Sequence, residues 1–225
     1  MVEYVVEFGK DGGRTEGDGR LDAPAFHRNH EAVRTPLQRF LAGKSGHVLE
    51  AGSGTGQHVV DLARHLPDII WWPSDLNEAH LKSIDAWRAH WRAANVRPPL
   101  RIDLSDPDWY GKLSGTGVPK QFLAVFCVNV IHIAPWRVAE GLVAGAARAL
   151  GGGGLFFLYG PFKRSGAHTA PSNAAFDTSL REGNAEWGVR DVEAVEELAA
   201  RGGLSLVEIA EMPANNLTLV FRRMS

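Results

Sequence analysis

The chain has 225 residues, with 24 Lys and Arg against 26 Asp and Glu, and this formal net charge of −2 excludes a polyanion binder held by bulk charge. With 44% hydrophobic and 22% charged residues, the composition is that of a globular domain with a full core. The single cysteine, Cys127, excludes an intrachain disulfide and a cysteine-based zinc site. Glycine alone is in excess, with 25 residues.

The first 27 residues are predicted to form an arm or hairpin, followed by one domain over residues 28–225. A strand-like segment, VEYVVEF, precedes the polar stretch GKDGGRTEGDG, which has too little apolar surface to fold by itself. The N-terminus carries acidic residues where a signal peptide needs basic ones, and the longest apolar run is too short to cross a bilayer. We therefore expect a cytoplasmic protein without a membrane partner.

The next segments alternate between helical and strand patterns. Residues 29–41 have helical spacing, although Pro36 interrupts the pattern. From residue 47 onward, short apolar runs predict strands at HVLEAG, IIWWPSD, PLRIDL, FLAVFCVN and GLFFLYG, with helices at 57–65, 77–93 and 135–150. Such βαβ alternation predicts a parallel sheet with helices on both faces.

The last third of the chain breaks this alternation. Residues 161–188 are predicted to be loop-rich, and a helix is expected at 189–201. The strands LSLVEIAEM and LTLVFRR are joined only by PANN, and so short a connection predicts an antiparallel pair.

A glycine-rich turn, EAGSGTGQ, joins the first predicted strand to the next helix. Glycines at 52, 54 and 56 let a ligand approach the backbone, and the helix N-terminus favours an anionic or polar group. The spacing is G-x-G-x-G, whereas a dinucleotide fingerprint needs G-x-G-x-x-G, and no P-loop lysine follows. The turn therefore favours a nucleotide-like ligand other than a dinucleotide.

Three acidic residues follow three consecutive predicted strands. Glu50 can hold an ammonium group, Asp75 can accept hydrogen bonds from both ribose hydroxyls, and Asp103 can accept one from an adenine amine. A single acid at a strand end is often only a helix cap, but three in register are a stronger indication.

The turn, the acids and the final antiparallel strand together resemble class I S-adenosylmethionine-dependent methyltransferases. Segments such as DGRLDAPAFHRN, EAGSGTGQH, WWPSD, YGPFKR, HTAPSNAAFD and MPANNLTLVFRR look like a methyltransferase-like family of largely unassigned substrate. The resemblance implies a Rossmann-like, seven-stranded α/β sheet with a terminal antiparallel strand. It also implies S-adenosylmethionine as cofactor, with S-adenosylhomocysteine as product.

Carried over by position, the resemblance assigns the cofactor site. Glu50 would meet the methionine amino group, Asp75 the ribose, Asp103 and Leu104 the adenine, and Asn129 the methionine moiety. The full predicted cofactor set is Glu50, Gly52, Ser53, Gly54, Gly56, Gln57, Asp75, Leu76, Asp103, Leu104 and Asn129. Asn129-Val-Ile-His departs from the Asn-Pro-Pro-Tyr pattern of planar-amine methyltransferases, which disfavours methylation of a nucleobase or glutamine.

Candidates for acceptor chemistry lie after the fourth and fifth predicted strands, because ligands bind outside the carboxyl ends of parallel strands. His132 is the candidate base, since an ordinary histidine pKa of about 6.5 suits proton transfer at neutral pH, and Tyr159 is the second catalytic candidate. The predicted acceptor-binding residues are Arg28, Asn29, Trp136, Phe162, His168, Asn173, Asn215 and Asn216. The histidines lack metal-ligand spacing, so no metal is expected.

These observations favour a methyltransferase acting on O, N or S of a small polar molecule, as a monomer or homodimer without a nucleic-acid partner. Two alternatives stay open. One is a nicotinamide-dependent oxidoreductase, which the glycine spacing disfavours. The other is a scaffold protein that binds S-adenosylmethionine without catalysis, because the sequence identifies no indispensable base.

Overall fold

The computed structural model describes residues 17–224, and the chain divides into two compact units, Met1–Asp103 and Leu104–Ser225. The predicted strand VEYVVEF and most of the glycine-rich arm lie outside the described residues.

The N-terminal unit contains three parallel strands in the order β3-β2-β1. Strands β1 (Gly46–Ala51) and β2 (Ile69–Asp75) lie where the sequence predicts them, with Glu50 opposite Pro73 in the register. Strand β3 is only Leu100–Arg101, shorter than predicted. The strand begins at Leu100, because the two preceding prolines have no N–H to donate to a ladder, and it ends at Arg101, three residues before the predicted end.

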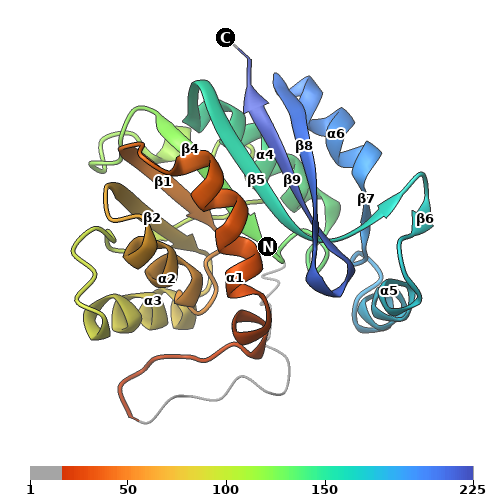
Figure 1. Ribbon diagram of the computed structural model, residues 1–225, viewed down its shortest axis with the longest axis horizontal. Helices are drawn as coiled ribbons and strands as arrows, with labels where there is room; N and C mark the ends of the chain where they lie inside the picture. The colour runs from red at the N-terminus through yellow and green to blue at the C-terminus, as the bar shows by residue number, and fades with distance from the viewer. Residues whose placement is uncertain (1–16, 225) are drawn as a thin grey trace. The chain divides into compact units, whose positions relative to one another are not determined.

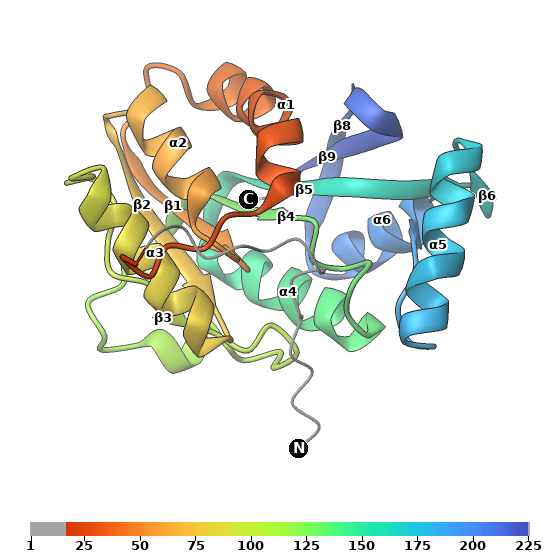
Figure 2. The same ribbon diagram turned by 90° about the horizontal axis from the view of Figure 1, so that it is seen from below.

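Three helices of this unit are α1 (Pro24–Leu41), α2 (Gln57–His65) and α3 (Glu78–His90), with α1 beside α2 and α2 beside α3 (Figure 2). Helix α1 begins five residues before the predicted start, because Pro24 occupies its first turn, where a missing N–H costs nothing. Pro36 lies inside the helix and does not end it. Val33, Leu37 and Leu41 are buried, as their spacing predicts.

The C-terminal unit contains a four-stranded path, β4-β5-β9-β8, shown in Figure 1. Its strands are β4 (Phe122–Val128), β5 (Leu150–Arg164), β8 (Leu204–Met212) and β9 (Asn216–Arg223). Strands β4 and β5 are parallel, and β9 is antiparallel to both β5 and β8. The predicted antiparallel pair is therefore confirmed, and the reversed strand lies between β5 and β8.

Helices α4 (Trp136–Ala149) and α6 (Val192–Arg201) contact each other and pack on this sheet. Two short 3-10 helices, η1 (Gly111–Leu113) and η2 (Pro213–Asn215), also belong to this unit. Trp109 packs so tightly on α4 that a Cβ at Gly145 would lie 2.0 Å from its indole ring. Across residues 17–224, none of the helices has the length and apolar character needed to cross a bilayer.

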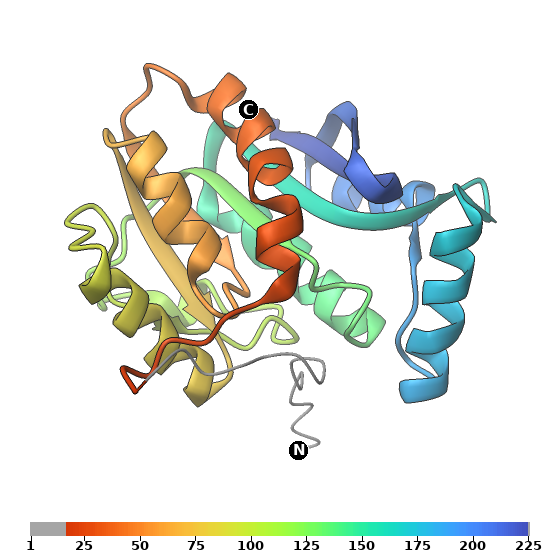
Figure 3. The same ribbon diagram turned by 60° about the horizontal axis from the view of Figure 1, so that its bottom comes forward.

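The stretch 161–188, predicted to be loop-rich, contains regular structure. Strand β5 continues to Arg164, and β6 (Ala167–His168), helix α5 (Pro171–Gly183) and β7 (Arg190–Asp191) follow (Figure 3). The prediction failed for α5 because its buried positions are Asn173, Asp177 and Leu180. Two of these three are polar, so the helix lacks the apolar periodicity by which helices are found in sequence.

Candidate functional site

The glycine turn after β1 has left-handed backbone at each of its three glycines. The φ angles are 75° at Gly52, 55° at Gly54 and 87° at Gly56, in the region that L side chains rarely adopt. A Cβ at Gly56 would also lie 2.8 Å from the Cα of Ile84 on α3. The predicted turn is therefore formed, and Gly56 is required by both its conformation and its packing.

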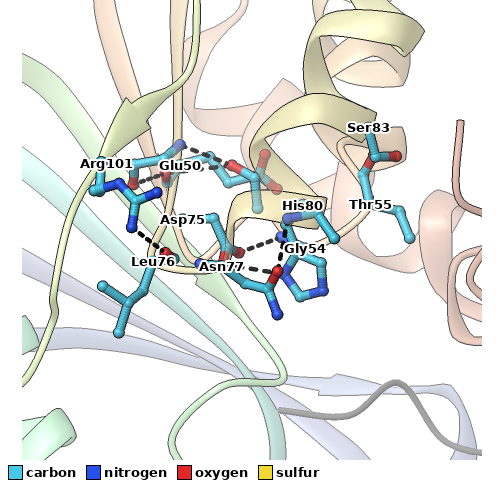
Figure 4. A network of polar contacts seen from close by, with 12 residues as sticks. Glu50, Gly54, Thr55, Asp75, Leu76, Asn77, His80, Ser83 and Arg101 are labelled. Carbon is cyan, nitrogen blue, oxygen red and sulfur yellow. Dashed lines mark hydrogen bonds and ion pairs between the residues drawn. The ribbon is translucent and has the colours of Figure 1, made fainter. Parts of the chain in front are cut away.

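The carboxylate of Asp75, at the end of β2, closes this turn (Figure 4). Oδ2 accepts a hydrogen bond from the backbone N–H of Gly54 at 2.9 Å, and Oδ1 accepts one from Asn77 at the same distance. Nδ1 of His80 lies 3.0 Å from Oδ1. Because each carboxylate oxygen has two lone pairs, Oδ2 retains acceptor capacity for a hydroxyl group.

Glu50 is buried in β1, with 1% of its surface exposed. Among residues 17–224, none donates a hydrogen bond to its Oε2 atom. Burial raises the pKa of Glu50 to about 8, and the charge of Asp75 raises it further, while a hydrogen bond from Ser53 acts in the opposite direction. Glu50 is therefore a buried acid whose ionised form a nearby positive charge would favour.

Two residues of the predicted cofactor set use their side chains inside the protein. The Ser53 hydroxyl accepts a hydrogen bond from Ser74 N–H at 3.0 Å, which joins the turn to β2. Oε1 of Gln57 accepts a hydrogen bond from the N–H of Ala23, and Nε2 of Gln57 donates one to Oδ1 of Asp22, both at 2.7 Å. Gln57 thus anchors the segment before α1.

The remaining cofactor candidates fall in different places. Leu76 follows Asp75, and its carbonyl accepts a hydrogen bond from Arg101. Asp103 is exposed and lies two residues beyond β3, whereas Leu104 is buried in the C-terminal unit. Asn129 follows β4 with φ 57°, and its N–H donates to the Tyr159 carbonyl at 3.0 Å.

His132 is buried in the C-terminal unit, near Asn129 and β5. A Cβ at Gly160 would lie 3.3 Å from the His132 ring and 3.6 Å from Oδ1 of Asn129. Burial, together with the charge of Arg190, lowers the pKa of His132 to about 3. This pKa lies well below the ordinary histidine value of about 6.5 that made His132 the candidate base, and such a ring is uncharged at neutral pH with little affinity for a proton.

Tyr159 was expected to end the fifth strand, but β5 continues five residues beyond it and the side chain is 4% exposed. Phe162, an acceptor candidate, is likewise buried within β5. The Trp136 ring lies under the Arg190 guanidinium, 5.7 Å from its centroid. Arg190 also donates to the carbonyls of Ile131 and Ala134, so it fixes the loop after β4.

The other C-terminal candidates gather around α5. Nδ2 of Asn173 donates to the Asn215 carbonyl at 2.9 Å, which joins α5 to η2, and Asn216 begins β9. Nε2 of His168 lies 3.4 Å from Oδ2 of Asp177. Lys163 and Arg181 contact the same oxygen at 3.1 and 3.2 Å. Asp177, which sequence reasoning missed, thus holds α5 to β5 and β6.

Two acceptor candidates belong to α1 in the N-terminal unit. Arg28 is exposed, whereas Asn29 is 8% exposed and its Oδ1 receives no hydrogen bond from the described residues. His80, beside Asp75, is a further residue that sequence reasoning missed. Its only signal was its place in the first turn of the helix after the strand-end acid.

Several solved structures that share the fold are named as methyltransferases. An O-methyltransferase family protein from Burkholderia thailandensis has a TM-score of 0.70 at 14% identity, over 89% of this chain and 59% of that one. Human N-acetylserotonin methyltransferase, solved in complex with SAM, has a TM-score of 0.69 at 12% identity, over 89% of this chain and 53% of that one. CalO1, a methyltransferase in calicheamicin biosynthesis solved with SAH bound, has a TM-score of 0.62 at 16% identity, over 87% and 56%.

The present chain thus spans little more than half the length of these neighbours. The likeness shows the fold, which is the α/β fold of class I S-adenosylmethionine-dependent methyltransferases, as the sequence resemblance implied. The profile of one family, described as Protein of unknown function (DUF938), matches residues 20–223. The chain belongs to this DUF938 family.

Proposed function

We propose that this chain is an S-adenosylmethionine-dependent methyltransferase that acts on O, N or S of a small polar molecule. Two observations in the N-terminal unit carry the proposal: Oε2 of the buried Glu50 receives no hydrogen bond from residues 17–224, and Asp75 is anchored to the glycine turn. The methyltransferase names of proteins with the same fold support it. Their O-methyltransferase descriptions favour oxygen among the three acceptor atoms.

The residues of the N-terminal unit fit the two polar ends of this cofactor. Oε2 of Glu50 is a buried acceptor that an ammonium group would satisfy, and the Coulombic gain would lower the pKa of the acid. Oδ2 of Asp75 would accept a ribose hydroxyl, while the glycines leave the backbone open to close approach.

The cofactor supplies a methyl group on a sulfonium centre, which is already activated for displacement. In the transfer, a bond from the acceptor atom to the methyl carbon would form as the sulfur–carbon bond breaks, and the electron pair of the broken bond would stay on sulfur as a neutral thioether. Any proton that the acceptor loses needs a destination, and a neutral His132 with a pKa of about 3 would hold it poorly. We therefore propose that catalysis rests on positioning of the acceptor rather than on His132 as a base.

Titration calorimetry with S-adenosylhomocysteine and with NADH tests the cofactor assignment. We expect binding of S-adenosylhomocysteine and no binding of NADH by the wild-type protein. Because free Glu50 is largely protonated at neutral pH, binding should release a proton, seen as a dependence of the measured heat on buffer ionisation enthalpy. Glu50→Gln should abolish that dependence, and binding of NADH alone would favour the oxidoreductase.

Transfer of a labelled methyl group tests the acceptor class and catalysis. Purified protein is incubated with methyl-labelled S-adenosylmethionine and a cell extract separated into small molecules, protein and nucleic acid. Label in the small-molecule fraction is expected. Label confined to protein or nucleic acid would contradict the proposed substrate class. Cofactor binding without label in any fraction would favour a scaffold protein that binds the cofactor without catalysis.

We also propose a cytoplasmic location and a monomeric or homodimeric state. The acceptor-binding residues that the sequence predicts, on α1 and in the C-terminal unit, are likewise proposed.

A further inference from the structure

His80 contacts the acid at the end of β2 without belonging to the glycine motif. It lies in the first turn of α3, and its side chain is 6% exposed. Its Nδ1 atom is 3.0 Å from Oδ1 of Asp75, whose side chain is 12% exposed. An imidazole buried against a carboxylate restricts the rotation of that carboxylate about its last side-chain bond.

The two oxygens of Asp75 have different surroundings. Oδ1 accepts a hydrogen bond from the N–H of Asn77, and Nδ1 of the His80 imidazole lies beside it at 3.0 Å. Oδ2 receives only the N–H of Gly54, so one of its lone pairs is left. Figure 4 shows these groups converging on the carboxylate. The asymmetry presents Oδ2, rather than Oδ1, to a ligand beside the glycine turn.

We propose that His80 is a positioning residue for nucleoside recognition: it holds Oδ1 of Asp75 so that Oδ2 is presented to a ribose hydroxyl. The inference rests on the proposed function, because it takes the ligand to be the adenosine part of the cofactor. His80 then acts through Asp75, and its contribution to affinity depends on the hydroxyl groups of the ligand.

A purely structural role for His80 makes a different prediction. If the imidazole only packed the N-terminus of α3, its removal would weaken every ligand of this site by the same factor. A positioning role weakens only ligands that carry ribose hydroxyls. The comparison therefore needs two ligands: S-adenosylhomocysteine and its analogue that lacks both the 2′ and 3′ hydroxyls.

The experiment measures the affinity of both ligands by calorimetry for wild type, His80→Leu, His80→Asn and His80→Gln. Asn places its amide nitrogen near the position of Nδ1, whereas Gln reaches the position of Nε2. We expect His80→Leu and His80→Gln to bind S-adenosylhomocysteine about tenfold more weakly, the scale of one hydrogen bond to a charged group. The dideoxy analogue should change by less than about twofold, and His80→Asn should restore most of the affinity.

His65→Leu is the matched control, because His65 also lies beside an aspartate, Asp61, but at the last residue of α2, away from the glycine turn. Its affinities should equal those of wild type. The proposed role of His80 would be overturned if the His80→Leu and His80→Gln variants lost affinity equally for both ligands, or if neither variant lost affinity. Absence of S-adenosylhomocysteine binding to wild type would instead overturn the proposed function. An Asp75→Ala variant that still distinguishes the two ligands as strongly as wild type would overturn the ribose assignment.

Discussion

Asp75 accepts a hydrogen bond at Oδ2 from the backbone N–H of Gly54, at 2.9 Å, and so joins the end of β2 to the turn that follows β1. This bond holds Gly54 and Asp75 together.

Replacement of Asp75 by alanine should therefore weaken S-adenosylhomocysteine binding by about 1.5 to 3 kcal/mol, the usual scale for hydrogen bonds to a charged group. The measurement is titration calorimetry. Asp85→Ala is the control and should bind normally, because Asp85 lies in α3, is half exposed and pairs with Arg88. Unchanged affinity in Asp75→Ala would refute the placement of the ribose.

The buried acid Glu50 should make stability depend on pH. Its folded-state pKa of about 8 lies above the ordinary value of 4.5, so its contribution is fully present below pH 4.5 and is lost as the pH rises through 8. Glu50→Gln cannot ionise and should lose less stability than wild type between about pH 5 and about pH 8.5. Urea unfolding at several pH values measures the difference, and parallel curves for the two proteins would contradict it.

Gly56 should tolerate alanine poorly. Its φ of 87° is strained for a side chain, and the added Cβ would lie 2.8 Å from a backbone atom of Ile84, which cannot rotate away. We expect a loss of more than about 2 kcal/mol in the free energy of unfolding. Gly43→Ala is the matched control, because Gly43 has φ 70° with nothing within 4 Å, and it should lose only about 1 kcal/mol. Equal losses would show that packing against α3 adds nothing.

His132 should stay uncharged across the neutral range. Its folded-state pKa of about 3 is below the ordinary 6.5, so the stability it contributes is present above pH 6.5 and is lost as the pH falls toward 3. Imidazole NMR signals, assigned by comparison with His132→Gln, should show no titration of this ring between about pH 5 and about pH 8. A midpoint near the ordinary value would restore His132 as a candidate base.

Asp177 should hold α5 in place. Burial alone would raise its pKa, but hydrogen bonds from Val189 N–H, Arg181 and Lys163 outweigh burial and lower it, so the carboxylate is charged at neutral pH. Asp177→Ala should cost about 1 to 3 kcal/mol and increase hydrogen exchange in residues 171–183. Glu182→Ala, at an exposed position of the same helix, should change neither. Unaltered exchange in Asp177→Ala would show that other contacts hold the helix.

The sequence by itself determined the strands and helices whose patterns are apolar and periodic. Helix α2 and strand β2 have the predicted bounds, and the antiparallel pair β8–β9 follows from a connection of four residues. The glycine turn was also predicted, because positive φ and close backbone approach leave a direct trace in residue type.

Only the tertiary structure decided the features that depend on distant neighbours. Helix α5 was missed because its buried face is polar, and that face becomes stable only when Asp177 meets Lys163 and His168. The pKa values of Glu50 and His132 depend on burial by other parts of the chain, which local sequence does not encode. The contact between His80 and Asp75 likewise exists because the start of α3 folds back on the end of β2.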